Sequence, residues 1–409
     1  MTRRAAHLFG TIGLAGLLLA AASVSANAQK KYDTGVTDTE IKIGNTIPYS
    51  GPASVYAIIG KTYSAFFRMI NDNGGINGRK INFISYDDAY SPPKAVEQTH
   101  KLVESDEVFI DFAPLGTPSN AAIQKYLNQK GVPQLFVGSG ASRWGDPTHF
   151  PWTIGLQPSY RSEARIYATY IQKNYPGKTI GILYQNDDFG KDYIVGLKDV
   201  LRDDYAKLVV AESAYEVSSP TVDSLIVGIR TANPDIFINI ATPKFAAQAI
   251  KKVAELNWHP IHIMTNVAIS PAQTLKPAGY ENSTGILSAA YQMIVTDPVM
   301  EATPGMKKFR AFMEKYYPEA DKSESGPLTA WNAGNVLVAL LKQCGDNLTR
   351  ENVMKQAANL DLEVDTYLPG VRIKTSASDF YPIEQLQMMK FNGQTWELFG
   401  PLIDSHQEE

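Results

Sequence analysis

The chain has 409 residues, with 38 Lys and Arg against 42 Asp and Glu, which gives a formal charge of −4. Hydrophobic residues make up 44% of it and charged residues 20%, a composition typical of folded proteins that excludes a disordered chain. The slightly acidic balance argues against a nucleic-acid-binding protein, and the single cysteine excludes a disulfide within the chain and a cysteine-rich metal site.

Residues 1–28 have the pattern of a secretory signal peptide. Arg3 and Arg4 precede an apolar run over 8–22, and Ala26-Asn27-Ala28 supplies the small residues of a cleavage site. The apolar run is shorter than the ~20 residues that a membrane-spanning helix needs. We therefore expect cleavage after Ala28 and a mature protein that is free in a bacterial periplasm.

From residue 41 to residue 264, short apolar strands alternate with amphipathic helices. In the helix expected over 56–73, Ile59, Tyr63, Phe66 and Ile70 fall on one face. Such alternation predicts parallel sheets that are covered by helices on both faces. The predicted strands are 41–47, 80–86, 108–112, 132–137, 179–184, 208–215, 235–240 and 261–264. The predicted helices are 56–73, 92–104, 118–129, 161–175, 189–202, 222–231 and 245–256.

Beyond residue 285 the pattern changes to longer helices. Cys344 lies on the leucine-bearing face of one of them, which predicts a buried thiol and not a nucleophile. Asn392-Gly393 fits a type I′ hairpin turn near the end of the chain, because both residues tolerate positive φ. The elements predicted here are a strand over 285–293 and helices over 304–317, 328–344 and 351–359.

Two segments of the alternating part echo each other weakly. Phe112 leads to Gly116-Thr117-Pro118, and Asn239 leads to Ala241-Thr242-Pro243. In both segments a strand is followed by a small residue and by Thr-Pro at the start of a helix. Two similar α/β halves would face each other across a cleft. The alternative is coincidence, since Thr-Pro is common where helices begin.

No motif in the sequence indicates catalysis or a metal centre. The close histidine pair His259 and His262 does not fit one face of a helix. The turn at 138–142 (Gly-Ser-Gly-Ala-Ser) lacks both the nucleophile-elbow and the nucleotide-loop spacings. Its N–H groups and hydroxyls would suit a carboxylate, or it is a plain tight turn. The aspartate pairs 87–88 and 187–188 are expected to serve as turn and cap residues. We expect no catalytic residue, no metal and no cofactor.

Six short motifs follow one another in order over about 150 residues. Their order behind a signal peptide resembles the periplasmic leucine/isoleucine/valine-binding protein family, the type I solute-binding components of ABC importers. In look the chain is most similar to the members that bind aromatic acids. The motifs are Ile41-Lys-Ile-Gly with Tyr49-Ser-Gly-Pro, Asn71-Asp-Asn-Gly-Gly-Ile-Asn-Gly, Tyr86-Asp-Asp with Pro93-Lys-Ala-Val, Gly131-Val-Pro, Gly140-Ala-Ser and Asn186-Asp-Asp-Phe-Gly.

This resemblance implies an α/β fold of the type I periplasmic-binding-protein kind, with two Rossmann-like lobes joined by three hinge crossings. Each lobe then draws on discontinuous sequence, so no linker is visible. The crossings are expected near 156–158, 287–291 and 367–370. The expected lobes are 29–156 with 291–367 for lobe 1, and 157–290 with 368–409 for lobe 2.

The resemblance also implies which residues contact a ligand. In relatives that bind amino acids, two hydroxyl-bearing loops hold the ligand's carboxylate and ammonium. These loops correspond to 116–117 and 139–142, and the aromatic residue of the first cleft loop corresponds to Tyr56. Phe189 and Thr242 stand where those relatives often carry tyrosine. The expected ligand-binding residues are Tyr56, Gly116, Thr117, Ser139, Gly140, Ser142, Phe189, Thr242 and Asn266.

One departure from the family bears on the ligand. Amino-acid binders pair the ammonium with an acid in the loop after the strand at 261–264, but this loop reads Thr265-Asn266-Val267-Ala268. A buried ammonium without a carboxylate partner costs several kcal/mol. We therefore expect a small carboxylate with an aromatic or hydrophobic body, of the benzoate or phenylpropenoate type. An acid from a neighbouring loop would restore the alternative, an amino-acid-binding protein of the same family.

The resemblance implies an ABC permease in the inner membrane as partner, no nucleic acid, and a monomer. A ligand sensor of the same fold that works with a receptor is an alternative. An exported hydrolase that uses Ser139 or Ser142 is a further alternative from another class. It would need a base near that turn, where His149 is the nearest histidine in the sequence.

Overall fold

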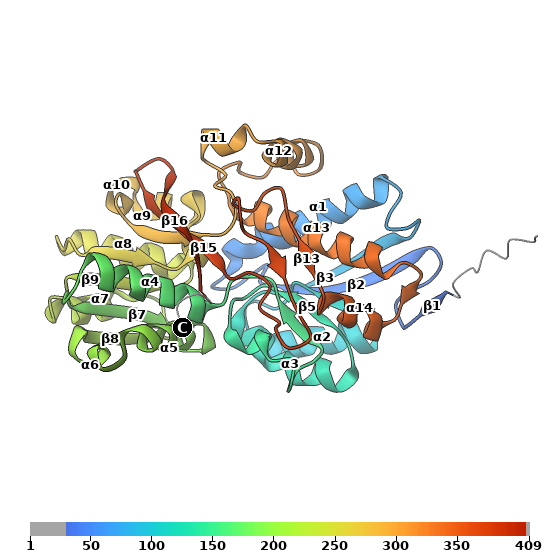
Figure 1. Cartoon of the computed structure of the whole chain (residues 1–409), viewed down its shortest axis with the longest axis horizontal. Helices are drawn as coiled ribbons and strands as arrows, with labels where there is room; N and C mark the ends of the chain where they lie inside the picture. The colour runs from blue at the N-terminus through green and yellow to red at the C-terminus, as the bar shows by residue number, and fades with distance from the viewer. Residues whose placement is uncertain (1–29, 406–409) are drawn as a thin grey trace, which may run out of the picture.

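A computed structural model describes residues 30–405 of the chain. The described residues form two α/β halves that lie side by side along the long axis of the molecule (Figure 1). One half is built on a five-stranded sheet and the other on a seven-stranded sheet, and we name the halves by these sheets. The signal peptide expected over 1–28 lies outside the described residues.

The five-stranded half contains a parallel sheet with the strand order β3-β2-β4-β5-β6. Apolar side chains at helical spacing on α1, such as Ile59, Tyr63 and Phe66, are buried against this sheet and α13. The strands are β2 (Glu40–Ile47), β3 (Lys80–Asp87), β4 (Ile110–Phe112), β5 (Gln134–Val137) and β6 (Thr153–Gly155). The connecting helices are α1 (Ala57–Asp72) after a turn at Ser54–Tyr56, α2 (Pro92–Glu104) and α3 (Thr117–Lys130), with a further turn at Ser142–Gly145.

The seven-stranded half has the strand order β16-β15-β11-β10-β9-β7-β8. The strands from β11 to β8 pair in parallel, and β15 and β16 add an antiparallel edge. The strands are β7 (Ile180–Gln185), β8 (Val209–Tyr215), β9 (Ile236–Ile240), β10 (Ile261–Met264), β11 (Leu287–Ala290), β15 (Gln385–Phe391) and β16 (Trp396–Asp404). The helices are α4 (Tyr160–Asn174), α5 (Asp188–Leu201), α6 (Tyr205–Leu208), α7 (Asp223–Thr231), α8 (Pro243–Glu255), α9 (Lys276–Ala278) and α10 (Tyr280–Ser283), with turns at Arg202–Asp204, Asn266–Ala268 and Pro271–Leu275.

After β11 the chain returns to the five-stranded half. Helix α13 packs against α1 and α14, and α12 also contacts α1. The helices are α11 (Pro298–Glu301), α12 (Pro304–Tyr316), α13 (Gly326–Cys344) and α14 (Arg350–Ala357). Two small pairings complete this half: β1 (Lys31–Tyr32) with β12 (Asn347–Leu348), and β13 (Asp361–Leu362) with β14 (Ile373–Lys374).

The end of this second stretch differs from the boundary expected at residue 368. The β13–β14 pairing keeps 373–374 beside 361–362, and the Thr375 hydroxyl donates to the carbonyl of Ala357 at 2.7 Å. The chain joins the seven-stranded sheet only at Gln385. We therefore propose that the seven-stranded half resumes at residue 385.

The hairpin of β15 and β16 forms, but the predicted type I′ turn is wrong. Phe391 pairs with Trp396, so the loop has the four residues 392–395. Only Gly393 of this loop has a positive φ, 98°. The Asn392 side chain instead accepts hydrogen bonds from two backbone N–H groups of the loop, both at 2.9 Å. The side chain of Asn392 thus stabilises a four-residue loop, which is longer than the two-residue loop of a type I′ turn.

Several side chains singled out in the sequence are structural. Cys344 is 5% exposed, as predicted, and burial raises the pKa of its thiol to about 12. The ring of buried His262 contacts the Asn239 amide at 3.3 Å, and burial lowers its pKa to about 3, whereas His259 is exposed. Residues 30–405 contain no group of three or more acidic, Cys or His side chains that could hold a metal ion.

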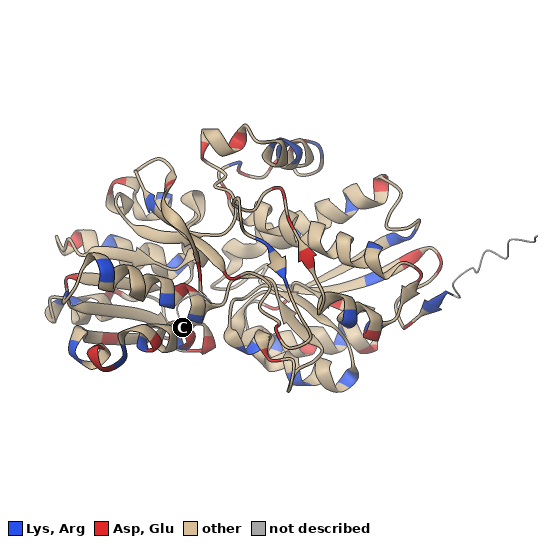
Figure 2. Ribbon diagram, in the orientation of Figure 1, with Lys and Arg blue, Asp and Glu red and all other residues tan. Residues whose placement is uncertain are grey.

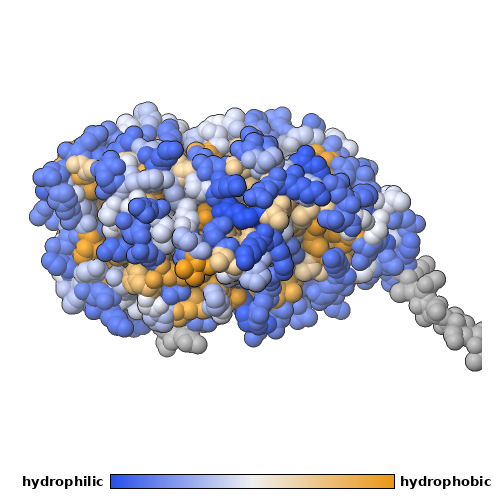
Figure 3. Space-filling view, turned by 90° about the horizontal axis from the view of Figure 1, so that it is seen from above, coloured by the Kyte–Doolittle hydropathy of each residue, from blue (hydrophilic) through white to orange (hydrophobic). Residues whose placement is uncertain are grey.

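The surface is polar and carries both charges. Figure 2 shows Lys and Arg interspersed with Asp and Glu over both halves. The face in Figure 3 is mostly hydrophilic, with hydrophobic residues in separate small patches. Across the described part of the chain, no helix combines the length and apolar character that crossing a bilayer requires.

Candidate functional site

A cavity of about 100 Å³ lies between the two halves. Its walls come from loops that follow β2, β4, β5, β7, β9 and β10, so it lies at the carboxyl edges of both sheets. Open α/β sheets bind their ligands at this edge. Since a cavity holds a water molecule when it offers roughly 10–15 Å³, this one has room for a small organic molecule.

Six of the nine predicted site residues line this cavity. Tyr56 and Asn266 come from loops of opposite halves, and Phe189 lies in the first turn of α5. Gly116 and Thr117 begin α3, and Thr242 immediately precedes α8. The two Thr-Pro segments that echo each other in the sequence therefore open into one cavity from opposite halves.

The two helix starts give the cavity an electropositive character without a basic side chain. The first N–H groups of α3 and α8 have no partner within their helices, and the helix dipole adds partial positive charge there. Among the described residues that line the cavity there is no Lys, Arg or His. An anion in this cavity would be held by N–H groups and hydroxyls.

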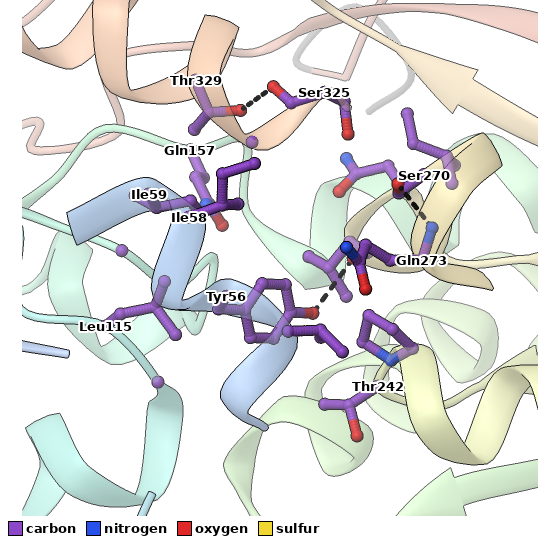
Figure 4. A pocket seen from close by; sticks show the side chains of 18 of the residues that line it. Tyr56, Ile58, Ile59, Leu115, Gln157, Thr242, Ser270, Gln273, Ser325 and Thr329 are labelled. Carbon is purple, nitrogen blue, oxygen red and sulfur yellow. Dashed lines mark hydrogen bonds between the residues drawn. The ribbon is translucent and has the colours of Figure 1, made fainter. Parts of the chain in front are cut away.

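The cleft between the halves is closed over the cavity. The Tyr56 hydroxyl donates to the carbonyl of Val267 at 3.0 Å (Figure 4). The Ser270 hydroxyl donates to Oε2 of Glu324 at 2.7 Å. Each bond joins one half to the other. The 266–273 segment, which follows β10, is thereby tied to the five-stranded half at two points.

Tyrosines that the sequence analysis did not select form much of the remaining wall. Tyr90, Tyr160 and Tyr291 line the cavity, and the rings of Tyr160 and Phe189 meet edge to face at 4.9 Å between centroids. Burial raises the pKa of Tyr160 to about 12, so its hydroxyl stays protonated at neutral pH. The sequence carries no local signal for these rings, because they meet only through folding.

The other three predicted residues lie outside the cavity wall. The Ser139 hydroxyl lies 2.7 Å from that of Thr117 and accepts from the indole of Trp144 at 3.0 Å. A Cβ on Gly140 would come within 2.4 Å of the carbonyl oxygen of Pro158. The backbone and hydroxyl of Ser142 donate to the carboxylate of Asp192 at 2.6 and 2.8 Å. These contacts shape and anchor the turn behind the cavity.

Glu324 is an acid at the cavity that the sequence analysis missed. It directly precedes Ser325 and the start of α13, and its side chain is buried, with 3% exposed. Oε2 accepts from Ser270, whereas Oε1 has no hydrogen-bond partner within residues 30–405. Burial raises the pKa of this carboxyl, and the Ser270 hydroxyl and the Gln273 amide oppose that rise. Glu324 is therefore an acid from a neighbouring loop, of the kind that would restore the alternative of an amino-acid ligand.

A second buried acid positions the loop that carries Asn266. Oε1 of Glu163 accepts from the backbone N–H of Asn266 at 2.9 Å and from the Tyr167 hydroxyl at 2.6 Å. Burial raises the pKa of Glu163 to about 7. Glu163 thus lies behind the cavity wall and acts on the loop, not on the cavity itself.

Comparison with known proteins identifies the family. The sequence profile of the family described as periplasmic binding protein matches residues 40–395. The chain belongs to the periplasmic-binding-protein family. The resemblance seen in the sequence motifs is therefore confirmed.

Relatives of this periplasmic binding protein bind different small molecules. A leucine-, isoleucine-, valine-, threonine- and alanine-binding protein of Pseudomonas aeruginosa is 27% identical over 215 residues, which is about half of each chain (52% and 52%). A branched-chain amino acid ABC transporter structure from Thermus thermophilus with bound valine has a TM-score of 0.80 at 15% identity, covering 90% of this chain and 97% of that one. A solute-binding protein from R. palustris in complex with benzoate has a TM-score of 0.73 at 19% identity, covering 89% and 98%. These structures confirm the predicted α/β fold.

Members of this family are solute-binding proteins and not enzymes. The geometry of the turn at 139–142 agrees with that class. Ser139 bonds to Thr117 and Trp144 and Ser142 bonds to Asp192, whereas the ring of His149 is exposed beside Asp146. Within residues 30–405, neither Ser139 nor Ser142 forms a hydrogen bond with a histidine, which leaves the hydrolase alternative without support there.

Proposed function

We propose that this periplasmic binding protein captures a small carboxylate with an aromatic or other hydrophobic body for an ABC importer. The supporting observation is the cavity between the halves, where two helix starts meet aromatic and aliphatic walls without a basic side chain. In this arrangement Thr117 and Thr242 contact the carboxylate, and Tyr56 and Phe189 cover the body of the ligand.

The physical argument concerns hydration. A carboxylate that leaves water must receive hydrogen bonds in exchange. The backbone N–H of Thr117 at the start of α3 and the hydroxyl of Thr242 before α8 would supply them, whereas the N–H of Thr242 already donates to the Tyr215 hydroxyl. An apolar ring gains about 25 cal/mol for each Å² that leaves water. The benzoate bound by the R. palustris relative combines the same two chemical features.

The amino-acid alternative within the family is supported by one observation, the acid Glu324 at the cavity. The loop at 265–268 offers no acid for an ammonium, but Glu324 reaches the cavity from another element. A ligand that carries an amino group is therefore the second candidate.

The proposal includes the transport context. The protein would act as a monomer in the periplasm after cleavage behind Ala28, and would deliver its ligand to an inner-membrane permease. A sensor that reports ligand to a receptor would close in the same way. Loss of uptake of the ligand in a strain lacking the protein distinguishes transport from sensing, since a sensor mutant would keep its uptake.

A thermal-shift screen of the mature chain tests the ligand class. The panel contains benzoate, 4-hydroxybenzoate, cinnamate, aliphatic acids, leucine and phenylalanine. A ligand at 100 times its Kd stabilises the native state by about 2.7 kcal/mol. We expect the aromatic acids to raise Tm and leucine to leave it unchanged. A shift with leucine or phenylalanine instead would favour the second candidate, and no shift with any compound would refute the proposal.

A further inference from the structure

The cavity has two chemically different ends. Figure 4 shows Ser325 and Thr329 at one end and Thr242 at the other, with the ring of Tyr56 between them. The second end is formed by the start of α8, which suits an anion. The first end lies beside the start of α13 and contains Glu324.

Glu324 is the single acid among the described residues that line the cavity, and no basic side chain there balances it. Its Oε1 atom is buried without a hydrogen-bond partner. A buried acceptor without a partner destabilises the protein, and more so when it is charged. A ligand group that donates to Oε1 would remove this destabilisation.

The neighbouring polar groups are already engaged. The Gln292 amide donates to the hydroxyl of Thr329 at 3.0 Å, and the Asn332 amide donates to the Gln292 side-chain oxygen at 3.2 Å. Ser270 uses its hydroxyl hydrogen on Oε2 of Glu324. Among the described residues that line the cavity, two buried side-chain oxygens have no hydrogen-bond partner, Oε1 of Glu324 and Oε1 of Gln157. Of these two acceptors only Glu324 belongs to an acid, so it is the stronger acceptor for a ligand donor.

We propose that Oε1 of Glu324 accepts a hydrogen bond from a hydroxyl or ammonium group that the ligand carries at the end remote from its carboxylate. Glu324 then determines which carboxylates the protein selects. This inference rests on the proposed function, because it assumes that the carboxylate occupies the end formed by α3 and α8. An α-amino acid does not meet the requirement, since its ammonium and carboxylate share one carbon atom.

The test compares ligands that share a benzoate core and differ only at the far end. Isothermal titration calorimetry on the mature chain uses benzoate, 4-hydroxybenzoate and 4-(aminomethyl)benzoate. We expect one of the two donor-bearing compounds to bind about tenfold more tightly than benzoate, which corresponds to one hydrogen bond to a charged group. Which of the two prefers the site identifies the donor as a hydroxyl or an ammonium.

Two variants separate recognition from closure of the cleft. Glu324→Leu removes Oε1 and should bring the affinities for the three compounds within about twofold of one another. Ser270→Ala is the matched control, because it removes the bond across the cleft and leaves Oε1 in place. It should weaken the binding of all three compounds by the same factor and preserve the preference.

Each contrary result has its own meaning. Equal binding of the three compounds to the wild-type protein would overturn the role of Glu324 and leave the proposed function intact, even if Glu324→Leu did not fold. A preference that survives in Glu324→Leu would overturn it as well. Stronger binding of phenylalanine than of 4-(aminomethyl)benzoate would place the acid next to the carboxylate and contradict the remote position. Failure of all carboxylates to bind would refute the proposed function together with this inference.

Discussion

The hydroxyl of Tyr56 joins the two halves of the molecule at the cavity. It belongs to the five-stranded half and donates at 3.0 Å to the carbonyl of Val267 in the seven-stranded half. The substitution Tyr56→Phe removes this bond and retains the aromatic wall of the cavity. We expect it to weaken ligand binding and to leave the fold of each half unchanged.

The magnitude follows from the state in which the bond exists. A hydrogen bond contributes about 0.5–1.5 kcal/mol net, and this one forms only when the halves are closed. Its loss therefore favours the open form by about 1 kcal/mol. Because the ligand binds to the closed form, the apparent Kd should rise about fivefold.

Calorimetry with the tightest-binding carboxylate of the thermal-shift panel measures this effect. Tyr49→Phe is a matched control, because the Tyr49 hydroxyl bonds to the Ser85 hydroxyl at 2.7 Å within the five-stranded half. Both variants lose one phenolic hydrogen bond, but only Tyr56→Phe should raise Kd. An unchanged Kd for Tyr56→Phe, or an equal rise in both variants, would refute the reasoning that closure through Val267 supports binding.

Three further predictions concern stability and reactivity. Burial raises the pKa of Glu163 from 4.5 to about 7, so its contribution to stability is greatest below pH 4.5 and is lost as the pH rises to 7. In urea unfolding, the free energy of unfolding of the wild type should fall by about 3 kcal/mol relative to that of Glu163→Gln over this pH interval. If the free energies of unfolding of the two proteins changed with pH in parallel, this prediction would be contradicted. Gly116→Ala would place a Cβ 2.5 Å from the Tyr90 ring at a φ of 104°, whereas Gly177→Ala meets open space at a φ of 75°. In thermal unfolding, Gly116→Ala should lower the free energy of unfolding by about 1–3 kcal/mol more than Gly177→Ala does. Equal losses of stability in the two variants would be inconsistent with crowding by Tyr90. The buried thiol of Cys344, whose pKa burial raises to about 12, should react with a thiol reagent only after unfolding, and rapid labelling of the native protein would exclude this burial.

The architecture was predictable because its signals are local. The period of apolar residues marks α1 within one helical turn, and Thr-Pro marks the starts of α3 and α8. Helical spacing predicted that Cys344 is buried. Family motifs at short spacing then placed Tyr56 and Thr242 at a cavity that no local pattern could have assembled.

What the sequence missed depends on partners that lie far apart along the chain. Ser142 resembled a ligand contact, but its partner Asp192 lies fifty positions away and holds it outside the cavity wall. No motif in the sequence marks Glu324, and its approach to Ser270, fifty-four positions away, brings it to the cavity. The turn predicted at Asn392 was wrong for a related reason, because a hydrogen bond to the Asn392 side chain stabilises a longer loop.

The sequence alone therefore determined the α/β class, the family and the Thr-Pro positions where two helices begin at the cavity. These features follow from residue spacing and from short motifs, which persist whatever the chain packs against. The tertiary structure decided which polar groups face the cavity and which are used elsewhere. Which polar groups face the cavity depends on how the two halves pack together. The hydrogen-bond partners of Tyr56, Ser142 and Glu324 all belong to the opposite half.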